Sequence, residues 1–153
     1  MNKTPCEKKA CELVDYLQVV MGEARGTDKK NRSICDILSP QEIQVLLTVG
    51  RQGPCTMSEI ADSIQLSLSS VTGIVDKLEE KKLARRGRSS EDRRIVQAEL
   101  MNEGRRLHKL ALEGHIQFAH NMLKALDGEE QDFLVKLFRK VAAAIQSAKK
   151  TPA

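Results

Sequence analysis

Two helix-start signals follow each other closely in the first half of the chain, and they constrain the fold more than any other feature. Ser39 precedes a proline and is followed three residues later by Glu42, and Thr56 is followed at the same spacing by Glu59. In this pattern, a capping box, the hydroxyl and the carboxylate each accept a free backbone N–H at the helix start. A glycine and a proline end the first helix before the second begins. We therefore expect two short helices joined by a brief connection.

A third helix start follows at Ser67 or Ser69, and the helix is expected to continue to about Lys82. Apolar residues recur at helical spacing in all three segments, so each helix has one face for a core. Two short helices with so brief a turn between them are typical of a helix-turn-helix. The expected inward positions are Ile43, Leu46, Leu47, Gly50, Met57, Ile60, Ala61, Ile64, Leu68, Val71, Ile74, Val75 and Leu78.

The pattern changes after Leu83. Two short stretches, residues 83–85 and 95–98, flank a charged segment with Gly87 and two serines at its middle. This arrangement predicts a β-hairpin with a basic tip. The expected fold is therefore mostly α with a small β-hairpin wing: a winged helix-turn-helix at residues 39–104. Residues 1–38 would supply an N-terminal dimerisation helix and a linker, and residues 105–153 the C-terminal dimerisation helices.

Basic residues are concentrated between Lys77 and Arg94. This segment has eight basic and four acidic residues, so its net charge of +4 equals that of the whole chain. A local positive patch suits a phosphate-binding surface, and a merely solvated charged face is the alternative. Arginine side chains fit narrow minor grooves and phosphate oxygens. Five arginines belong to the hairpin: Arg85, Arg86, Arg88, Arg93 and Arg94.

Small polar residues dominate the outward face of the third helix. Such residues can approach bases and phosphates closely in a major groove, and the first-turn N–H groups attract phosphate. The outer face of an ordinary helical bundle, which is the alternative, would more often carry long glutamate and lysine side chains. We therefore expect double-stranded DNA as a partner. The outward residues are Ser67, Ser69, Ser70, Thr72, Gly73, Asp76 and Lys77.

Asp92 stands among the wing arginines, where a carboxylate is unexpected on a phosphate-binding surface. One interpretation is that it is an anchor that fixes the direction of an arginine. The other is that it is an ordinary hairpin-turn residue.

Apolar stripes also mark the helices expected at the two ends of the chain. They run through Leu13 and Leu17 near the N-terminus, and through Phe133, Leu137 and Val141 near the C-terminus. These faces either pack within the chain or join two copies of it. We favour a homodimer, which would place two recognition helices about one DNA turn apart, roughly 34–36 Å, and predicts a pseudo-palindromic site.

The sequence resembles the MarR family of bacterial winged-helix regulators from Leu38 to about Leu107. The residues that carry the resemblance are LSPQEIQVLLTVG, TMSEIADSIQLSLSSVTGIVDKLEEKKLARR and EDRRIVQAELMNEG. The resemblance implies a sequence-specific transcriptional regulator, usually a repressor, that acts as a triangular homodimer. It implies that the helix from Ser67 to Lys77 contacts the major groove.

The resemblance also assigns roles in the wing. It implies that Arg94 enters the minor groove, that Asp92 positions Arg94, and that Arg93 contacts a phosphate or solvent. One departure is visible: the family usually shows Leu-Thr-x-x-Gly after the wing, whereas Met101 replaces the threonine here. Methionine cannot cap a helix, but Asn102 could if the helix start slipped by one residue.

Regulators that resemble this chain are usually released from DNA by a small ligand, a metal or thiol oxidation. Cys6 and Cys11 are candidates for a redox role, but five residues on a helix place them about 140° apart. Inert, buried or half-buried thiols are the alternative for all four cysteines, which include Cys35 and Cys55. We expect an unidentified small-molecule effector or oxidant, no cofactor, and histidines that lie in solvent or at an interface rather than at a metal.

Several functional classes find no support in the sequence. No apolar stretch approaches the roughly 20 residues that span a bilayer, and the N-terminus has no signal-peptide pattern, so we expect a cytoplasmic protein without membrane contact. No phosphate loop, nucleophile elbow or HExxH motif is present, so we expect no enzyme. The remaining alternative is a winged-helix adaptor that binds a protein instead of DNA.

Overall fold

The computed structural model describes residues 4–26, 34 and 36–150 of the 153-residue chain. The chain divides into two compact units, residues 1–115 and 116–153, which are described separately. Its elements are α1 (Pro5–Gly26), α3 (Pro40–Gln52), β1 (Cys55–Thr56), α4 (Met57–Ile64), α5 (Leu68–Glu80), β2 (Ala84–Arg88), β3 (Val96–Leu100), α6 (Asn102–Leu123) and α7 (Gly128–Lys150). The predicted fold class, a mostly helical winged helix-turn-helix, is confirmed.

Local capping chemistry begins the three helices of the helix-turn-helix region. The Ser39 hydroxyl accepts the Glu42 N–H at 3.3 Å, and the Glu42 carboxylate accepts the Ser39 N–H at 2.7 Å. Thr56 and Glu59 form the same pair of bonds at the start of α4. Ser67 caps α5. Gly53 ends α3 at a φ of 86°, where glycine meets no steric penalty. Both predicted capping boxes are therefore present.

The core of the first unit lies where α3, α4 and α5 meet the sheet. Most of the predicted inward positions are buried or half-buried, including Leu46, Ile60 and Leu78, which are fully enclosed. The prediction for Leu68 is wrong, since this side chain is 53% exposed. Leu68 is the first residue of α5, one turn before the helix meets the core, so its side chain lies outside.

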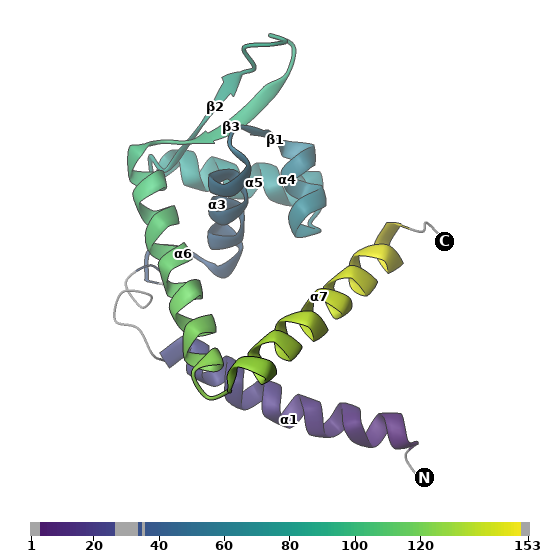
Figure 1. Ribbon diagram of the computed structural model, residues 1–153. Coiled ribbons are helices and arrows are strands. Elements are labelled where there is room, and N and C mark those ends of the chain that lie inside the picture. The colour runs from purple at the N-terminus through teal and green to yellow at the C-terminus, as the bar shows by residue number, and fades with distance from the viewer. Residues whose placement is uncertain (1–3, 27–33, 35, 151–153) are drawn as a thin grey trace. The chain divides into compact units, whose positions relative to one another are not determined.

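The wing is part of a three-stranded antiparallel sheet with the order β1-β3-β2 (Figure 1). The hairpin strands are longer than predicted: Gly87 lies within β2 opposite Gln97 and not at the turn. Strand β1 was not predicted; Cys55 pairs with Ala98. A two-residue strand has no recognisable alternation of its own, and it forms because β3 offers a free edge.

Helix α6 begins at the position that the sequence left in question. Asn102 is its first residue, and the Met101 carbonyl accepts the Arg105 N–H at 2.8 Å. Met101 therefore occupies the cap position, and the proposed slip to an Asn102 cap does not occur. The Met101 N–H donates to the Leu83 carbonyl at 2.9 Å, which fixes the helix start against the turn before the wing.

The second unit consists of the last part of α6 together with the whole of α7. Asp127 and Glu130 form a further capping box with two bonds of 3.0 Å, and this box begins α7 after the predicted break. No described residue of α7 is buried, although its apolar residues recur at helical spacing. The large apolar residues of α7 that are exposed are Phe133, Val135, Leu137, Phe138, Val141 and Ile145.

Candidate nucleic-acid interface

The N-terminus of α5 presents a cluster of exposed serines. The Ser67 hydroxyl lies 3.0 Å from that of Ser69 and 2.7 Å from that of Ser70, and it accepts the Ser70 N–H at 3.1 Å. All three side chains are exposed. Hydroxyls can donate and accept, so this cluster is suited to phosphate oxygens and base edges alike.

The rest of the outward face of α5 divides into two stripes. Gly73 and Lys77 follow Ser69 at intervals of four residues; Gly73 has open space beside it, and Lys77 is exposed. The second stripe is formed by Thr72, Asp76 and Glu79. There the Thr72 hydroxyl donates back to the Leu68 carbonyl at 2.8 Å, so its hydrogen already has an acceptor inside the helix.

Arg86 of β2 covers the second stripe of α5. Its guanidinium lies 2.5 Å from Asp76 and 3.1 Å from Glu79, and it donates to the Thr72 carbonyl at 3.0 Å. Its backbone N–H donates to Glu79 at 2.7 Å. Arg86 therefore joins the wing to α5 instead of extending from the wing into solvent. Nothing in the sequence pattern separated it from the other arginines.

Two further basic residues of the segment from Lys77 to Arg94 have partners within the fold. The Lys81 amine lies 2.7 Å from the buried carboxylate of Glu42 and 2.9 Å from the Ile37 carbonyl. Arg85 pairs with Glu99 across the hairpin at 2.6 Å. The local charge that the sequence shows is thus partly neutralised by carboxylates that come from other elements.

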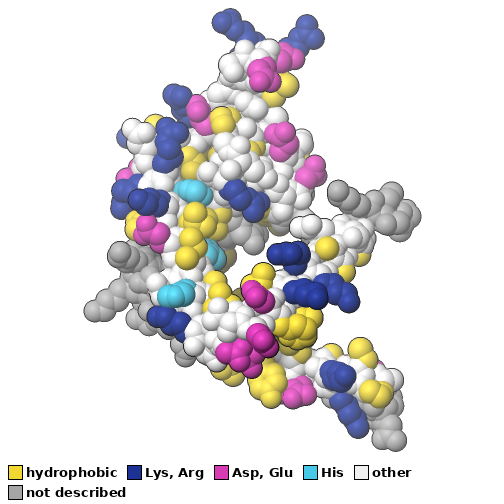
Figure 2. Space-filling view, in the orientation of Figure 1, with side chains coloured by type: hydrophobic (Ala, Val, Ile, Leu, Met, Phe, Trp, Pro, Cys, Tyr) yellow, Lys and Arg dark blue, Asp and Glu magenta, His cyan; other side chains and the backbone are white. Residues whose placement is uncertain are grey.

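The basic groups left for a partner lie on α5, in the turn that follows it and at the wing tip. Within the described ranges, the side chains of Lys77, Lys82, Arg93 and Arg94 have no hydrogen bond or ion pair. Arg88 makes one long bond, 3.4 Å, to the Arg93 carbonyl. Figure 2 shows the dark blue side chains projecting from the tip of the hairpin. The predicted DNA-contacting set is therefore divided into engaged and available cations.

Asp92 shapes the turn of the wing. Its carboxylate accepts the backbone N–H of Arg94 at 2.9 Å, and its carbonyl accepts the Ile95 N–H at 3.0 Å. This is the hydrogen-bond pattern of an Asx-turn. The carboxylate thus fixes the backbone of Arg94, and no ion pair joins the two side chains in the described part of the chain. Both interpretations of Asp92 meet here, because a turn residue can position Arg94 through its backbone.

The cysteines do not share one environment. Cys55 is buried, as predicted, and its thiol donates to the Gly53 carbonyl at 2.9 Å. Burial, followed by the nearby charge of Glu59, raises the pKa of the Cys55 thiol. Cys6 and Cys11 are exposed, as are the residues around them on α1, so the prediction of buried or half-buried fillers is wrong for these two cysteines. Cys35 lies outside the described residues.

The histidines form no common site. His108 packs against Gly50 of α3, and His115 Nδ1 lies 2.7 Å from the Ala111 carbonyl. Over the ranges that the structure describes, no group of three or more His, Cys, Asp or Glu side chains is placed to hold a metal ion.

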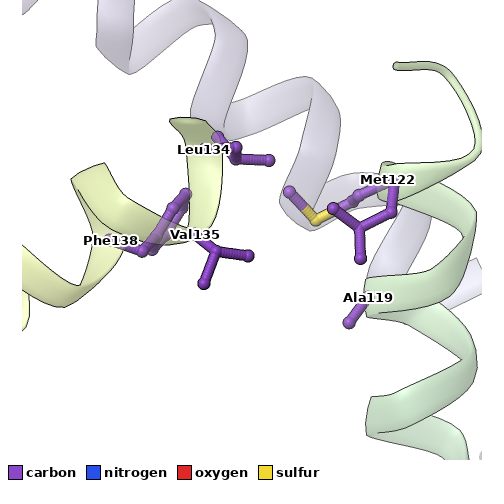
Figure 3. A pocket seen from close by; sticks show the side chains of 6 residues that line it. Ala119, Met122, Leu134, Val135 and Phe138 are labelled. Carbon is purple, nitrogen blue, oxygen red and sulfur yellow. The ribbon is translucent and has the colours of Figure 1, made fainter. Parts of the chain in front are cut away.

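An apolar cavity of about 250 Å³ lies between the end of α6 and the start of α7 (Figure 3). It is lined by Ala119, Met122, Leu123, Leu134, Val135 and Phe138. Pockets for small ligands are usually larger, about 300–1,000 Å³, and combine apolar walls with a few polar groups. This cavity has no polar side chain, and its walls continue into the exposed apolar face of α7.

The chain is similar in sequence to known transcriptional regulators. The family model described as MarR matches residues 38–96. The chain is 32% identical over 104 residues to the HTH-type transcriptional regulator MhqR of Bacillus subtilis, covering 68% of this chain and 72% of the relative. It is 29% identical over 113 residues to the HTH-type transcriptional repressor MdtR of the same organism, covering 74% and 73%.

Two solved structures show the same fold. Streptococcus pneumoniae FabT, solved in complex with DNA, superimposes with a TM-score of 0.71 at 22% identity, over 94% of this chain and 96% of FabT. PcaV of Streptomyces coelicolor, solved with its natural ligand, superimposes with a TM-score of 0.66 at 20% identity, over 95% and 99%. Among the described residues, no helix is both long and apolar enough to cross a membrane.

Proposed function

Because the chain belongs to the MarR family of DNA-binding transcriptional regulators, we propose that it is a repressor that binds a pseudo-palindromic operator as a homodimer. A small ligand or an oxidant releases it from the operator, and it acts in the cytoplasm. The observation that carries the proposal is the open stripe of α5, from Ser69 to Lys77, together with unpaired cations at the wing tip.

The division of the basic residues supports DNA as the partner. A recognition helix in the major groove and a wing in the adjacent minor groove need small polar side chains on the helix and arginines on the wing. Gly73 and the serines leave room for a close approach to bases, while Arg93 and Arg94 extend from the hairpin. An adaptor surface for a protein partner would instead expose large aromatic anchors, and α5 and the hairpin contain no aromatic residue; their exposed large apolar side chains are Leu68, Ile95 and Val96.

The exposed apolar faces of α1 and α7 support the homodimer. On α1, Leu13, Val14 and Leu17 are each at least 44% exposed; on α7, Phe133 and Phe138 are at least 58% exposed. Contiguous exposed apolar faces are rare on monomeric proteins and usually mark an interface. The apolar cavity beside α7 is continuous with the exposed apolar face of α7. We therefore assign the cavity to the subunit interface and not to the effector.

Relatives support release by an effector. PcaV was solved with its natural ligand, and the DNA binding of Bordetella bronchiseptica BpsR is regulated by 6-hydroxynicotinic acid. Repression is supported by MdtR, which is named as a repressor. Exposed Cys6 and Cys11 leave an oxidant as the other class of signal.

Selection of binding sites from random duplex DNA tests the proposal. The purified protein should enrich a motif with approximate two-fold symmetry and half-sites about ten base pairs apart. Light scattering on the free protein should give the mass of two chains. A pool without an enriched motif, or one with a single unrepeated half-site, would contradict the proposal. If the protein bound a protein partner and no DNA motif, the adaptor would be favoured.

A further inference from the structure

We infer that Arg86 serves DNA binding as a positioning residue: it tethers the wing to the recognition helix and neutralises Asp76 and Glu79, without contacting DNA itself. The inference rests on the DNA binding proposed above and assigns a role within that same interface. It differs from the expectation drawn from the sequence, which placed Arg86 among the DNA-contacting arginines.

The geometry of Arg86 shows the tether. Its contacts on α5 are Thr72, Asp76 and Glu79, which are four and three residues apart and therefore lie in one stripe along the helix. Its backbone N–H adds a fourth bond, to Glu79 Oε1 at 2.7 Å. Four bonds from one residue of β2 to successive turns of α5 fix the direction of the strand relative to the helix. The wing tip begins directly after β2 ends at Arg88, so it takes its position from this contact.

The charges explain why the contact matters for DNA. The stripe that Arg86 covers adjoins the open stripe of Ser69, Gly73 and Lys77, so both carboxylates lie beside the face that meets the phosphates. Charges closer together than the Debye length, about 8 Å at physiological salt, are only partly screened from one another. Without Arg86, two carboxylates would repel the phosphates. With Arg86, the group carries one negative charge in place of two.

The engagement of the guanidinium argues against a direct DNA contact. Nη1 donates to Asp76 and Glu79, Nη2 donates to the Thr72 carbonyl, and the side chain is only 27% exposed. These bonds use three of the five guanidinium N–H groups, and a swing of the side chain toward a phosphate would break the bonds to both carboxylates. Arg93 and Arg94 have no such partners among the described residues and can turn to DNA freely.

Three variants of the full-length protein test the inference on the duplex selected above: Arg86→Gln, the triple variant Arg86→Gln/Asp76→Asn/Glu79→Gln, and Arg85→Gln as a matched control. Arg85 lies next to Arg86 on β2 and has a single, mostly exposed ion pair with Glu99 of β3. The triple variant removes the two carboxylates and leaves side-chain amides that can still hydrogen-bond. Dissociation constants are measured over a range of salt, and thermal unfolding shows that each variant is folded.

We expect Arg86→Gln to weaken DNA binding about tenfold or more, Arg85→Gln to change it by about threefold at most, and the triple variant to regain most of the loss. The dependence of log K on log salt should keep its slope in Arg86→Gln, because no phosphate contact is lost. A slope smaller by about one would identify a phosphate contact and overturn the inference.

The remaining outcomes separate the two proposals. If the wild-type protein binds well but the triple variant binds as weakly as Arg86→Gln, the positioning role is overturned and the proposed function is not. If Arg86→Gln proves unfolded, the triple variant still decides, since wild-type affinity in a chain without the arginine supports the inference and weak binding overturns it. If the wild-type protein binds no duplex DNA, the proposed function is overturned and this inference is overturned with it.

Discussion

Gly104 of α6 lies directly against the backbone carbonyl of Leu83, so that a Cβ at position 104 would overlap the Leu83 oxygen. The same oxygen accepts the Met101 N–H at 2.9 Å. The start of α6 is thus held against the turn between α5 and the wing, and only a glycine allows the approach. The contact ties the long helix to the end of the recognition helix.

Replacement of Gly104 by alanine should therefore destabilise the protein, by about 1–3 kcal/mol as overpacking usually does. Backbone atoms cannot rotate away as a side chain can, so α6 must shift. Chemical denaturation measures the free energy of unfolding. Gly22→Ala is the matched control: Gly22 lies inside α1 with open space around it, so a gain of about 0.5–1 kcal/mol is expected there. Equal effects at both positions would contradict the packing argument.

Gly50 of α3 makes a second close approach, to the ring of His108 on α6. Gly50→Ala should force the imidazole out of its half-buried position and cost about 1–3 kcal/mol of stability. His108→Ala removes the obstacle, so the alanine at position 50 should cost much less in that background. A double-mutant cycle measures the difference, which we expect to exceed 0.5 kcal/mol, the usual lower range for contacting residues. Additive effects would show that the ring is not the obstacle.

The sequence predicted the parts of this fold that depend on neighbours in the chain. Ser39, Thr56 and Ser67 were recognisable as helix caps because a cap needs partners only two or three residues away. The helix-turn-helix and the wing then followed from periodicity and from the position of the charges. The exposed face of α5 could be predicted for the same reason.

Contacts between distant segments could not be predicted in this way. Arg86 and Arg94 have the same chemistry in the sequence, and only the approach of β2 to α5 gives one of them partners at Asp76 and Glu79. Strand β1 and the pairing of Lys81 with Glu42 likewise depend on segments about 40 residues apart. The sequence therefore could not show that Arg85 and Arg86 have carboxylate partners within the fold.

Glu42 should make stability depend on pH. Burial alone would raise the pKa of its carboxyl group, but hydrogen bonds from Lys81 and Ser39 together outweigh burial and lower the pKa below the ordinary value of 4.5. A lowered folded-state pKa contributes stability above pH 4.5, and this stability is lost as the pH falls through the folded-state value. Denaturation curves of wild type and Glu42→Gln should therefore converge as the solution is acidified below pH 4.5.

Lys81→Met serves as the control for Glu42, because it keeps the length of the stem and removes the charge. It should leave the buried carboxylate without its cation and destabilise the protein more at neutral pH than in acid, since the protonated carboxyl needs no cation. If wild type and Glu42→Gln lose stability in parallel on acidification, the carboxylate is not responsible for the pH dependence.

The cysteines should differ in reactivity. The thiol of Cys55 is 2% exposed, donates to the Gly53 carbonyl and has a raised pKa through burial and then Glu59, so little thiolate forms at neutral pH. Cys6 and Cys11 are exposed on α1. Iodoacetamide should therefore label Cys6 and Cys11 in the native protein well before Cys55, as peptide mass spectrometry would show. In denaturant, Cys55 should become as reactive as the others, and rapid native labelling of Cys55 would contradict its enclosed position.

The available cations of the interface make a final prediction about DNA affinity. Lys77 on α5 and Arg94 at the wing tip have no partner in the part of the chain that the structure describes, so each can neutralise a phosphate or enter a groove. Lys77→Ala should reduce the slope of log K against log salt by about one, as expected when one phosphate contact is lost. Arg94→Ala should weaken binding about tenfold or more, because arginine in a narrow minor groove contributes shape recognition as well as charge.

Two controls sharpen this comparison of Lys77 and Arg94. Lys9→Ala removes an exposed charge from α1, outside the interface, and should change neither the affinity nor the slope appreciably. Asp92→Ala removes the bond that fixes the backbone of Arg94 and should weaken binding without a smaller slope, because no cation is lost. If Lys9→Ala and Lys77→Ala had the same effect, only the net charge would matter, and the open stripe of α5 would not be the DNA-contacting face.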